Sequence, residues 1–279
     1  MKTLGKIFMG IVYAVLYAPL LVMVVFSFNS ARSTTIFGGF SLRWYNVLFE
    51  DFDMGDVLMN TLNIAIWAAV VATVLGVIAA YGIYRIRSKK LKSAFNTVTN
   101  VPLTNPDIIT GVSLMMLFTF FGALVLRRTE ILGFWTLLIA HITFNLPYVI
   151  LSVQPKLTQM DPNLTKAAMD LGCTPVQAFF KVVLHEIFPG IVSGALMAFT
   201  MSLDDFVISY FVYGPNFVTL PVEIYNYTKK PLHPKIYALF TLLFLAILLV
   251  MLLMNILQAR DTARHRNPRL KTQAGGTTM

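Results

Sequence analysis

Residues 161–175, DPNLTKAAMDLGCTP, contain two helix starts and one helix stop. Asp161 can cap a helix that begins at the following proline, because its carboxylate accepts from the first backbone N–H groups and proline suits the first helical position. Gly172 supplies the left-handed residue at which many helices end. Thr174 and the proline after it repeat the cap and first position. The stretch therefore predicts a helix, a break and a second helix.

Apolar residues recur at helical spacing on both sides of this break. They are Leu164, Ala167, Ala168 and Leu171 before it, and Val176, Phe179, Phe180, Val183 and Leu184 after it. By composition alone, an amphipathic hairpin on a membrane surface explains this pattern equally well. The small residues favour a protein partner instead, because alanine and glycine permit close approach, whereas lipid-binding helices carry bulkier groups.

The chain as a whole is too apolar for a soluble domain. Of its 279 residues, 57% are hydrophobic and 13% charged, and the mean hydropathy is +0.70. A membrane-spanning helix needs ~20 mostly apolar residues. The predicted spans are Ile7 to Phe28, Leu62 to Tyr84, Asp107 to Leu126, Phe134 to Val153, Phe188 to Phe211 and Ile236 to Leu257. The expected fold is an all-α polytopic membrane protein with about six transmembrane helices in the lipid bilayer.

The basic residues predict the orientation of these spans. With the N-terminus inside, 15 of the 22 Lys and Arg residues lie in cytoplasmic segments. This bias favours a multi-pass protein of the plasma (inner) membrane with both termini cytoplasmic, and it explains the net charge of +9 without nucleic acid as a partner. The first apolar run exceeds the ~7 to 15 residues of a signal-peptide core, so we expect a retained helix.

Three parts are expected along the chain. Residues 1–55 hold the first span and an external loop, and residues 56–257 hold the core with the remaining spans. Residues 258–279 are basic and then rich in Gly and Thr, which is typical of a disordered tail.

Two adjacent carboxylates, Asp204 and Asp205, lie inside or at the edge of the fifth predicted span. An ionisable group there is costly, so a role in a substrate pathway is expected, and a cationic cargo would offset the cost. Successive helical positions point ~100° apart, so only one of the two faces a pore squarely. Asp205 is the stronger candidate. The alternative for each is that it caps the helix or reaches water.

Further polar residues of the third and fourth spans stand near prolines, which bend helices and free backbone groups. Asn145 and Asp107 are candidates for the same substrate pathway. For His141 a packing role between helices is favoured over a functional one. For Asp107 a helix start on the cytoplasmic side explains the residue equally well.

The run Lys166-Ala167-Ala168-Met169-Asp170-Leu171-Gly172, followed by Phe179, Leu184 and Pro189, resembles the EAA loop of ABC importer permeases. The resemblance covers roughly Asp56 to Leu257 and implies a MetI-like (type I) core. In that family the loop is the coupling helix that docks on a cytoplasmic ATPase. The resemblance thereby assigns ATPase coupling to Lys166, Ala167, Ala168, Asp170, Leu171, Gly172 and Phe179.

This resemblance implies three protein partners: a second permease subunit, a dimer of ABC ATPases and an extracytoplasmic binding protein. The sequence departs from the motif at Lys166, where the family has Glu, at Cys173, where it has Ala, and at His185, where it has Pro. The first change reverses a charge, so we expect this chain's own ATPase to carry a differently charged mate.

Two segments bear on the cargo. Residues 202–225, SLDDFVISYFVYGPNFVTLPVEIY, and residues 39–45, GFSLRWY, resemble segments of spermidine/putrescine permeases. The resemblance implies that the cargo and the binding protein's ligand are polyamines; another small cationic or polar solute is the alternative. An ATP-independent channel or a secondary transporter is the alternative from a different functional class.

Motifs for catalysis are missing from the sequence. It has no G-x-x-x-x-G-K-[ST] phosphate loop, no nucleophile elbow and no His-rich zinc motif, and Cys173 is its single cysteine. We therefore expect no enzyme activity, catalytic residue, cofactor or metal in this chain, and ATP hydrolysis in a partner subunit.

Overall fold

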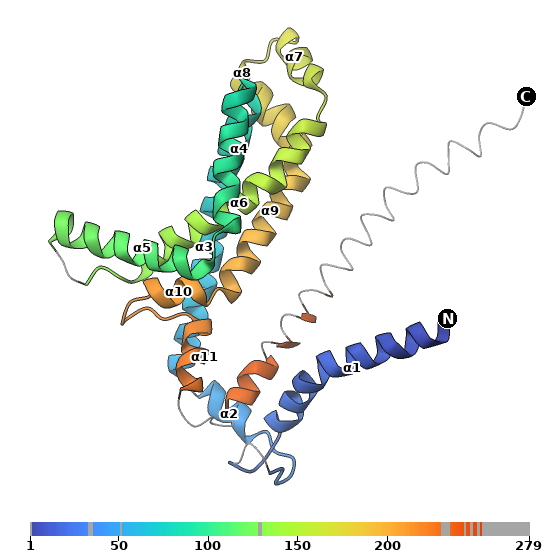
Figure 1. Ribbon diagram of the computed structural model, residues 1–279, viewed down its shortest axis with the longest axis vertical. Helices are drawn as coiled ribbons and strands as arrows, with labels where there is room; N and C mark the ends of the chain where they lie inside the picture. The colour runs from blue at the N-terminus through green and yellow to red at the C-terminus, as the bar shows by residue number, and fades with distance from the viewer. Residues whose placement is uncertain are drawn as a thin grey trace, which may run out of the picture. The chain divides into compact units, whose positions relative to one another are not determined.

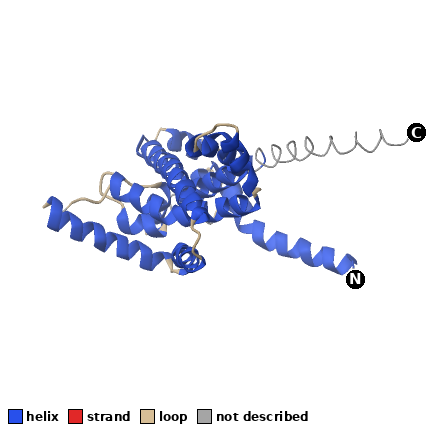
Figure 2. Ribbon diagram, turned by 90° about the horizontal axis from the view of Figure 1, so that it is seen from above, coloured by secondary structure: helices blue, strands red, loops and turns tan. Residues whose placement is uncertain are grey.

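The computed structural model describes residues 2–32, 36–50, 52–127, 130–229, 235–242, 244, 245, 248, 249 and 252. Their regular elements are helices (Figures 1 and 2), and only two isolated β-bridges occur among them. The long helices are α1 (Lys2–Ser27), α3 (Phe52–Arg85), α4 (Lys89–Thr104), α5 (Asp107–Phe121), α6 (Phe134–Gln159) and α9 (Leu184–Asp204). The shorter ones are α2 (Arg43–Phe49), α7 (Pro162–Asp170), α8 (Pro175–Ala178), α10 (Val207–Val212) and α11 (Leu220–Thr228), with π-helical turns η1 (Gly122–Leu126) and η2 (Phe179–Val183). The all-α prediction is confirmed.

Five helical stretches are long and apolar enough to cross a membrane. They are Gly5–Ser27, Met54–Arg85, Asp107–Val125, Phe134–Gln159 and Pro175–Asp204. Five of the six predicted spans therefore have a helical counterpart. Of the sixth, Ile236 to Leu257, the structure describes residues 236–242, 244, 245, 248, 249 and 252, and all of these are helical. The proposed tail, 258–279, lies wholly outside the described residues.

One detail of the predicted spans is wrong. The fifth span does not continue to Phe211, because α9 ends at Asp204 and a separate helix, α10, begins at Val207. The structure also shows a helix, α4, after Arg85, for which the sequence analysis makes no prediction. Ser88 caps α4 by accepting from the backbone N–H of Leu91, at 3.4 Å.

The described residues form two compact units. One is Asp53–Lys229, and the other combines the part before Asp53 with the described residues from 235 onward. In the smaller unit the indole N–H of Trp44 donates to the carbonyl oxygen of Asn29 at 2.6 Å, so α2 is tied to the end of α1. The division at residues 55 and 257 expected from the sequence stays a prediction.

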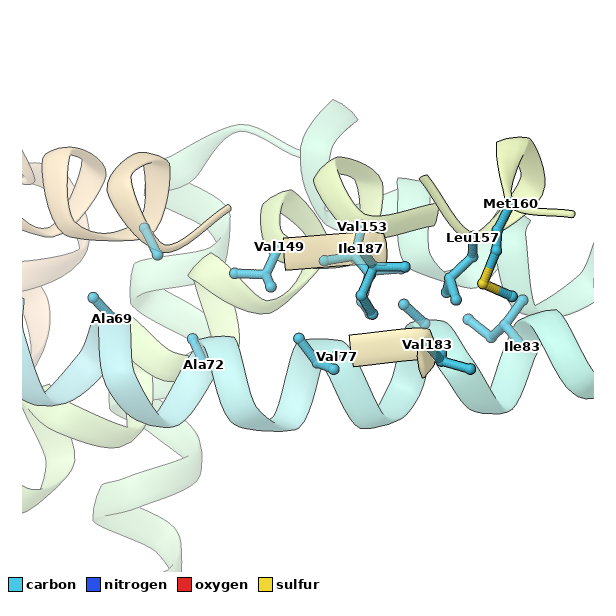
Figure 3. Packing of buried hydrophobic residues seen from close by; sticks show 13 residues of the cluster. Ala69, Ala72, Val77, Ile83, Val149, Val153, Leu157, Met160, Val183 and Ile187 are labelled. Atoms are coloured by element: carbon cyan, nitrogen blue, oxygen red, sulfur yellow. The ribbon is translucent and has the colours of Figure 1, made fainter. Parts of the chain in front are cut away.

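The core of the larger unit lies between α3, α6 and α9. Figure 3 shows Ala72 and Val77 of α3 pointing toward Val149 and Val153 of α6, with Ile187 of α9 beside them. A second cluster joins α3, α6 and α10 and includes Ile64, Leu137, Ile208 and Val212. The first cluster packs α9 against α6 and α3, and the second packs α10 against α6 and α3.

Glycines let α9 approach the backbone of α6 closely. A Cβ atom added at Gly190 would lie 2.9 Å from the carbonyl oxygen of Ser152, and one at Gly194 would lie 3.2 Å from the Cα of Val149. Backbone atoms cannot move aside as a flexible side chain can. The α6–α9 contact therefore depends on glycine at these positions.

We expect Gly190→Val to destabilise the chain by about 1–3 kcal/mol through overpacking against α6. The melting temperature of the purified protein in detergent measures the effect. Gly82→Val is the matched control, because Gly82 also lies in a helix but has nothing within 4 Å of an added Cβ. Equal melting temperatures for the two variants would contradict close packing at Gly190.

Candidate functional site

The loop between α6 and α9 begins with the predicted capped helix. The carboxylate Oδ1 of Asp161 accepts from the backbone N–H of Asn163 at 2.9 Å, and α7 starts at Pro162. Within the larger unit, α7 lies beyond the ends of α6 and α9 (Figure 1), while α10 lies toward their other end. The loop and the end of α9 at Asp204 are therefore separate sites.

Gly172 ends α7 with a φ of +89°. The backbone N–H of Gly172 donates to the carbonyl oxygen of Met169 at 2.9 Å, and that of Cys173 donates to the carbonyl oxygen of Ala168 at 3.0 Å. These two bonds form the Schellman motif, in which a left-handed residue turns the chain and satisfies the last carbonyl groups. The predicted break at Gly172 is confirmed.

The second helix start is also confirmed. Thr174 Oγ1 accepts from the backbone N–H of Gln177 at 3.3 Å, while Gln177 Oε1 accepts from the backbone N–H of Thr174 at 3.0 Å. This reciprocal pair is a capping box. It begins α8, which continues through η2 into α9, so the loop connects directly to a membrane-spanning helix.

The predicted coupling residues differ in exposure. Lys166, Ala167, Asp170, Leu171 and Gly172 are exposed, with Leu171 at 87%. Because so large an apolar side chain stands clear of its own chain, this surface is open to a partner. Ala168 is only 8% exposed and packs against its own chain, and its assignment to ATPase coupling stays a prediction.

Phe179 packs against the helices of the larger unit while part of its side chain stays exposed. It is half-buried, and its ring centroid is 4.7 Å from that of Tyr81 on α3. It packs against the cluster that includes Val183 and Ile187. Phe179 thus connects the loop to α3, and its predicted part in ATPase coupling stays a prediction.

A cavity of about 370 Å³ lies between the end of α3 and α7. It is lined by Tyr81, Tyr84, Arg85, Arg87, Pro162, Thr165, Lys166 and Met169. Three of these residues are cationic and none is acidic, so the surroundings of Lys166 favour an anionic group.

At the other end of α9, Asp205 caps the short helix α10. One carboxylate oxygen accepts from the backbone N–H of Ile208 at 3.3 Å, and the other accepts from the N–H and hydroxyl of Ser209 at 2.7 and 2.8 Å. The side chain of Asp205 is only 7% exposed. The capping role that the sequence left open is therefore the geometry observed.

Helix α6 contributes the partners of this polar cluster. His141 Nε2 lies 3.4 Å from the carboxylate of Asp205 and 3.0 Å from the hydroxyl oxygen of Ser209. One turn along α6, the amide nitrogen of Asn145 donates to the hydroxyl of Ser202 at 2.7 Å. The cluster thus joins α6 to both sides of the break between α9 and α10.

The structure does not bring the four predicted pathway residues together. Asn145 and Asp205 belong to the buried cluster, whereas Asp204 is exposed at the end of α9 and Asp107 is exposed at the start of α5. Sequence reasoning missed Ser209 as a member of the cluster. The sequence feature that could have indicated Ser209 is its position four residues after Asp205, because a carboxylate before a helix accepts from N–H groups of the first turn. Among the described residues, no group of three His, Cys, Asp or Glu side chains is placed to hold a metal ion.

Comparison with known proteins gives three kinds of match. Residues 72–264 match the family described as "binding-protein-dependent transport system inner membrane component". The putrescine transport system permease protein PotI of Escherichia coli (strain K12) is 39% identical over 248 residues, which is 89% of this chain and 88% of that protein. The spermidine/putrescine transport system permease protein PotC of the same organism is 36% identical over 257 residues, 92% and 94% of the two chains.

Two solved structures share the fold. A chain of a bacterial ABC transporter involved in the import of alginate superposes with a TM-score of 0.69 at 12% identity, covering 91% of this chain and 95% of that one. A chain of the MetNI methionine ABC transporter in an inward-facing conformation gives a TM-score of 0.57 at 20% identity, covering 72% and 93%. At these identities the likeness concerns the fold alone.

Proposed function

The chain belongs to the family of binding-protein-dependent transport system inner membrane components, and from this membership we propose that it forms half of a membrane pathway for polyamines. Its family makes it a multi-pass permease subunit of an ABC importer in the plasma membrane. A permease subunit is not an enzyme, and ATP hydrolysis lies in a partner subunit. The family also works with a partner permease and a substrate-binding protein.

One observation carries the polyamine assignment. The relatives that match this chain over about nine tenths of its length are permeases for putrescine and for spermidine/putrescine. The exposed carboxylate of Asp204 suits such a cargo, because a multivalent cation leaving water needs anionic partners. The proposed partners are a different permease chain, an ATPase dimer and an extracytoplasmic polyamine-binding protein.

The proposed contact with the ATPase is the exposed surface formed by Lys166, Ala167, Asp170, Leu171 and Gly172. Support comes from the exposure of Leu171 and from the small, exposed Ala167 one turn before it on α7. Phe179 then passes the movement on to Tyr81 of α3. Because α9 spans ~30 Å from η2 to Asp204, tilting it at the loop would move the proposed pathway at its other end.

The test is uptake by the complete importer in proteoliposomes. Radiolabelled putrescine and spermidine should accumulate only with ATP, the ATPase subunits and the binding protein all present. Accumulation of another small solute, with no competition from polyamines, would replace the cargo assignment. Uptake that proceeds equally without ATP would favour the channel or secondary transporter instead.

A charge change tests the docking surface. Because Lys166 is exposed beside Arg85 and Arg87 at the cavity, we expect it to face an acidic site on its ATPase. Lys166→Glu should weaken ATPase co-purification by ~0.2 to 1 kcal/mol, the usual size of an exposed ion pair, and more so at low salt. Lys166→Arg is the control that keeps the charge. Unchanged assembly of Lys166→Glu at low salt would show that Lys166 is merely solvated.

A further inference from the structure

The ammonium group of Lys229 lies against two tyrosine rings. Its Nζ is 4.5 Å from the ring centroid of Tyr225 and 5.4 Å from that of Tyr210. The same nitrogen donates to the hydroxyl oxygen of Tyr210 at 3.4 Å. A cation within ~6 Å of a ring centroid is attracted by the negative face of the ring. The tyrosines are thus positioned to hold an alkylammonium group.

Phe206 joins these two rings in one cluster. Its centroid is 4.8 Å from that of Tyr225 and 5.4 Å from that of Tyr210, and the tyrosine rings meet edge to face at 5.4 Å. Phe206 precedes α10, Tyr210 lies on α10 and Tyr225 lies on α11. We call Phe206, Tyr210 and Tyr225 the aromatic cage. Their mutual contacts fix the ring faces before any ligand arrives.

The rings are the partners of Lys229 within the described part of the chain. No described Asp or Glu forms an ion pair with it, since the single pair found there joins His141 and Asp205. Lys229 and Tyr225 are both exposed, so the ammonium group is exchangeable with one from solution. A lysine side chain ends in a primary alkylammonium, the same group that ends a linear polyamine.

The position of the cage fits a cargo path. Phe206 follows Asp204 by two residues, so the cage begins where the exposed carboxylate stands at the end of α9. The loop proposed to meet the ATPase is at the opposite end of α9, ~30 Å away along the helix. The cage is therefore on the side of the chain remote from the proposed ATPase contact.

We propose that the aromatic cage is a subsite for one primary ammonium group of the cargo and that Lys229 occupies it as a tethered competitor until cargo displaces it. The proposal rests on the proposed polyamine function. The cage would recognise the cargo through aromatic ring faces, in addition to the carboxylate of Asp204. Lys229 would limit the binding of cargo to the cage. Cargo and Lys229 compete for the same ring faces.

The experiment measures the half-saturating spermidine concentration for ATP-dependent uptake by the complete importer. Tyr225→Leu should raise it about fivefold to thirtyfold, while Tyr225→Phe, which keeps the ring face, should resemble the wild type. Lys229→Met should lower it about twofold to fivefold, and Lys229→Arg, which keeps a cation, should not. In the Tyr225→Leu background, Lys229→Met should have no further effect, because the site of competition has gone.

Several outcomes would overturn the proposal. Equal half-saturation in Tyr225→Leu and the wild type excludes the cage as a subsite. If Tyr225→Leu fails to assemble, the Lys229→Met variant alone tests the proposal, because Lys229 is exposed. An unchanged half-saturating spermidine concentration in Lys229→Met then excludes competition. A wild-type importer that takes up neither spermidine nor putrescine overturns the proposed function, and the cargo role of the cage with it. Normal uptake by the wild type with equal half-saturation in Tyr225→Leu overturns the cage alone, so the two failures are distinguishable.

Discussion

Gly172→Leu is expected to abolish uptake while the chain still inserts into the membrane. Gly172 has a φ of +89°, a conformation that costs a residue with a Cβ roughly 1–2 kcal/mol. An added Cβ meets no atom within 4 Å, so the expected damage comes from the backbone and not from crowding within the chain. A changed turn would redirect Leu171 and α7, which form the proposed docking surface.

ATP-dependent uptake and co-purification of the ATPase measure this effect. Gly172→Asn is the informative control, because asparagine adopts the left-handed conformation more readily than leucine, and we expect it to retain much of the activity. Gly172→Ala separates the cost of the φ angle from that of bulk. Wild-type uptake together with wild-type ATPase co-purification in Gly172→Leu would refute the coupling role.

Asp204→Asn is expected to reduce polyamine uptake on the order of tenfold without changing the melting temperature. Asp204 is exposed and its charge is available to cargo, so losing the charge should affect transport alone. Asp205→Asn should behave differently. Its carboxylate caps α10 with both oxygens, and asparagine turns one of these acceptors into a donor facing Ser209 and His141. We expect a loss of stability of about 1–3 kcal/mol.

Uptake and thermal unfolding of the purified complex, measured in parallel, separate these two roles. Glu130→Gln is the matched control, because Glu130 is an exposed carboxylate in the loop before α6. The geometry thus moves the expected pathway role from Asp205, which the sequence favours, to Asp204. Near-normal uptake in both variants would remove the carboxylates from the pathway and leave Asp205 as a structural cap.

Local signals made the loop predictable from sequence. Asp161, Gly172 and Thr174 each act within four residues of themselves, through a cap or a left-handed turn, and all three act in the structure as expected. The membrane spans were predictable for a similar reason, because hydrophobicity over ~20 residues needs no knowledge of distant contacts.

Contacts between distant segments were not predictable in this way. The break after Asp204 lies inside an apolar run, and a hydropathy pattern does not register a capping carboxylate. The partner of that carboxylate, His141, stands 64 positions away on another helix. Helix α4 was missed because its polar, basic start resembles a loop when read only for hydrophobicity.

The π-helical turn η2, Phe179–Val183, has a consequence for the length of this chain. A π-turn holds one residue more than an α-helical turn, and one residue corresponds to a rotation of ~100° about the helix axis. Removing a single residue from this turn would make the helix regular and would leave the later side chains of α9 close to their present directions, because the π-turn absorbs the surplus residue. The same deletion inside the regular part of α9 would rotate every later side chain by ~100°, so that Asp204 would face a new direction. Single-residue deletions in η2 should therefore be far better tolerated than single-residue deletions in α9.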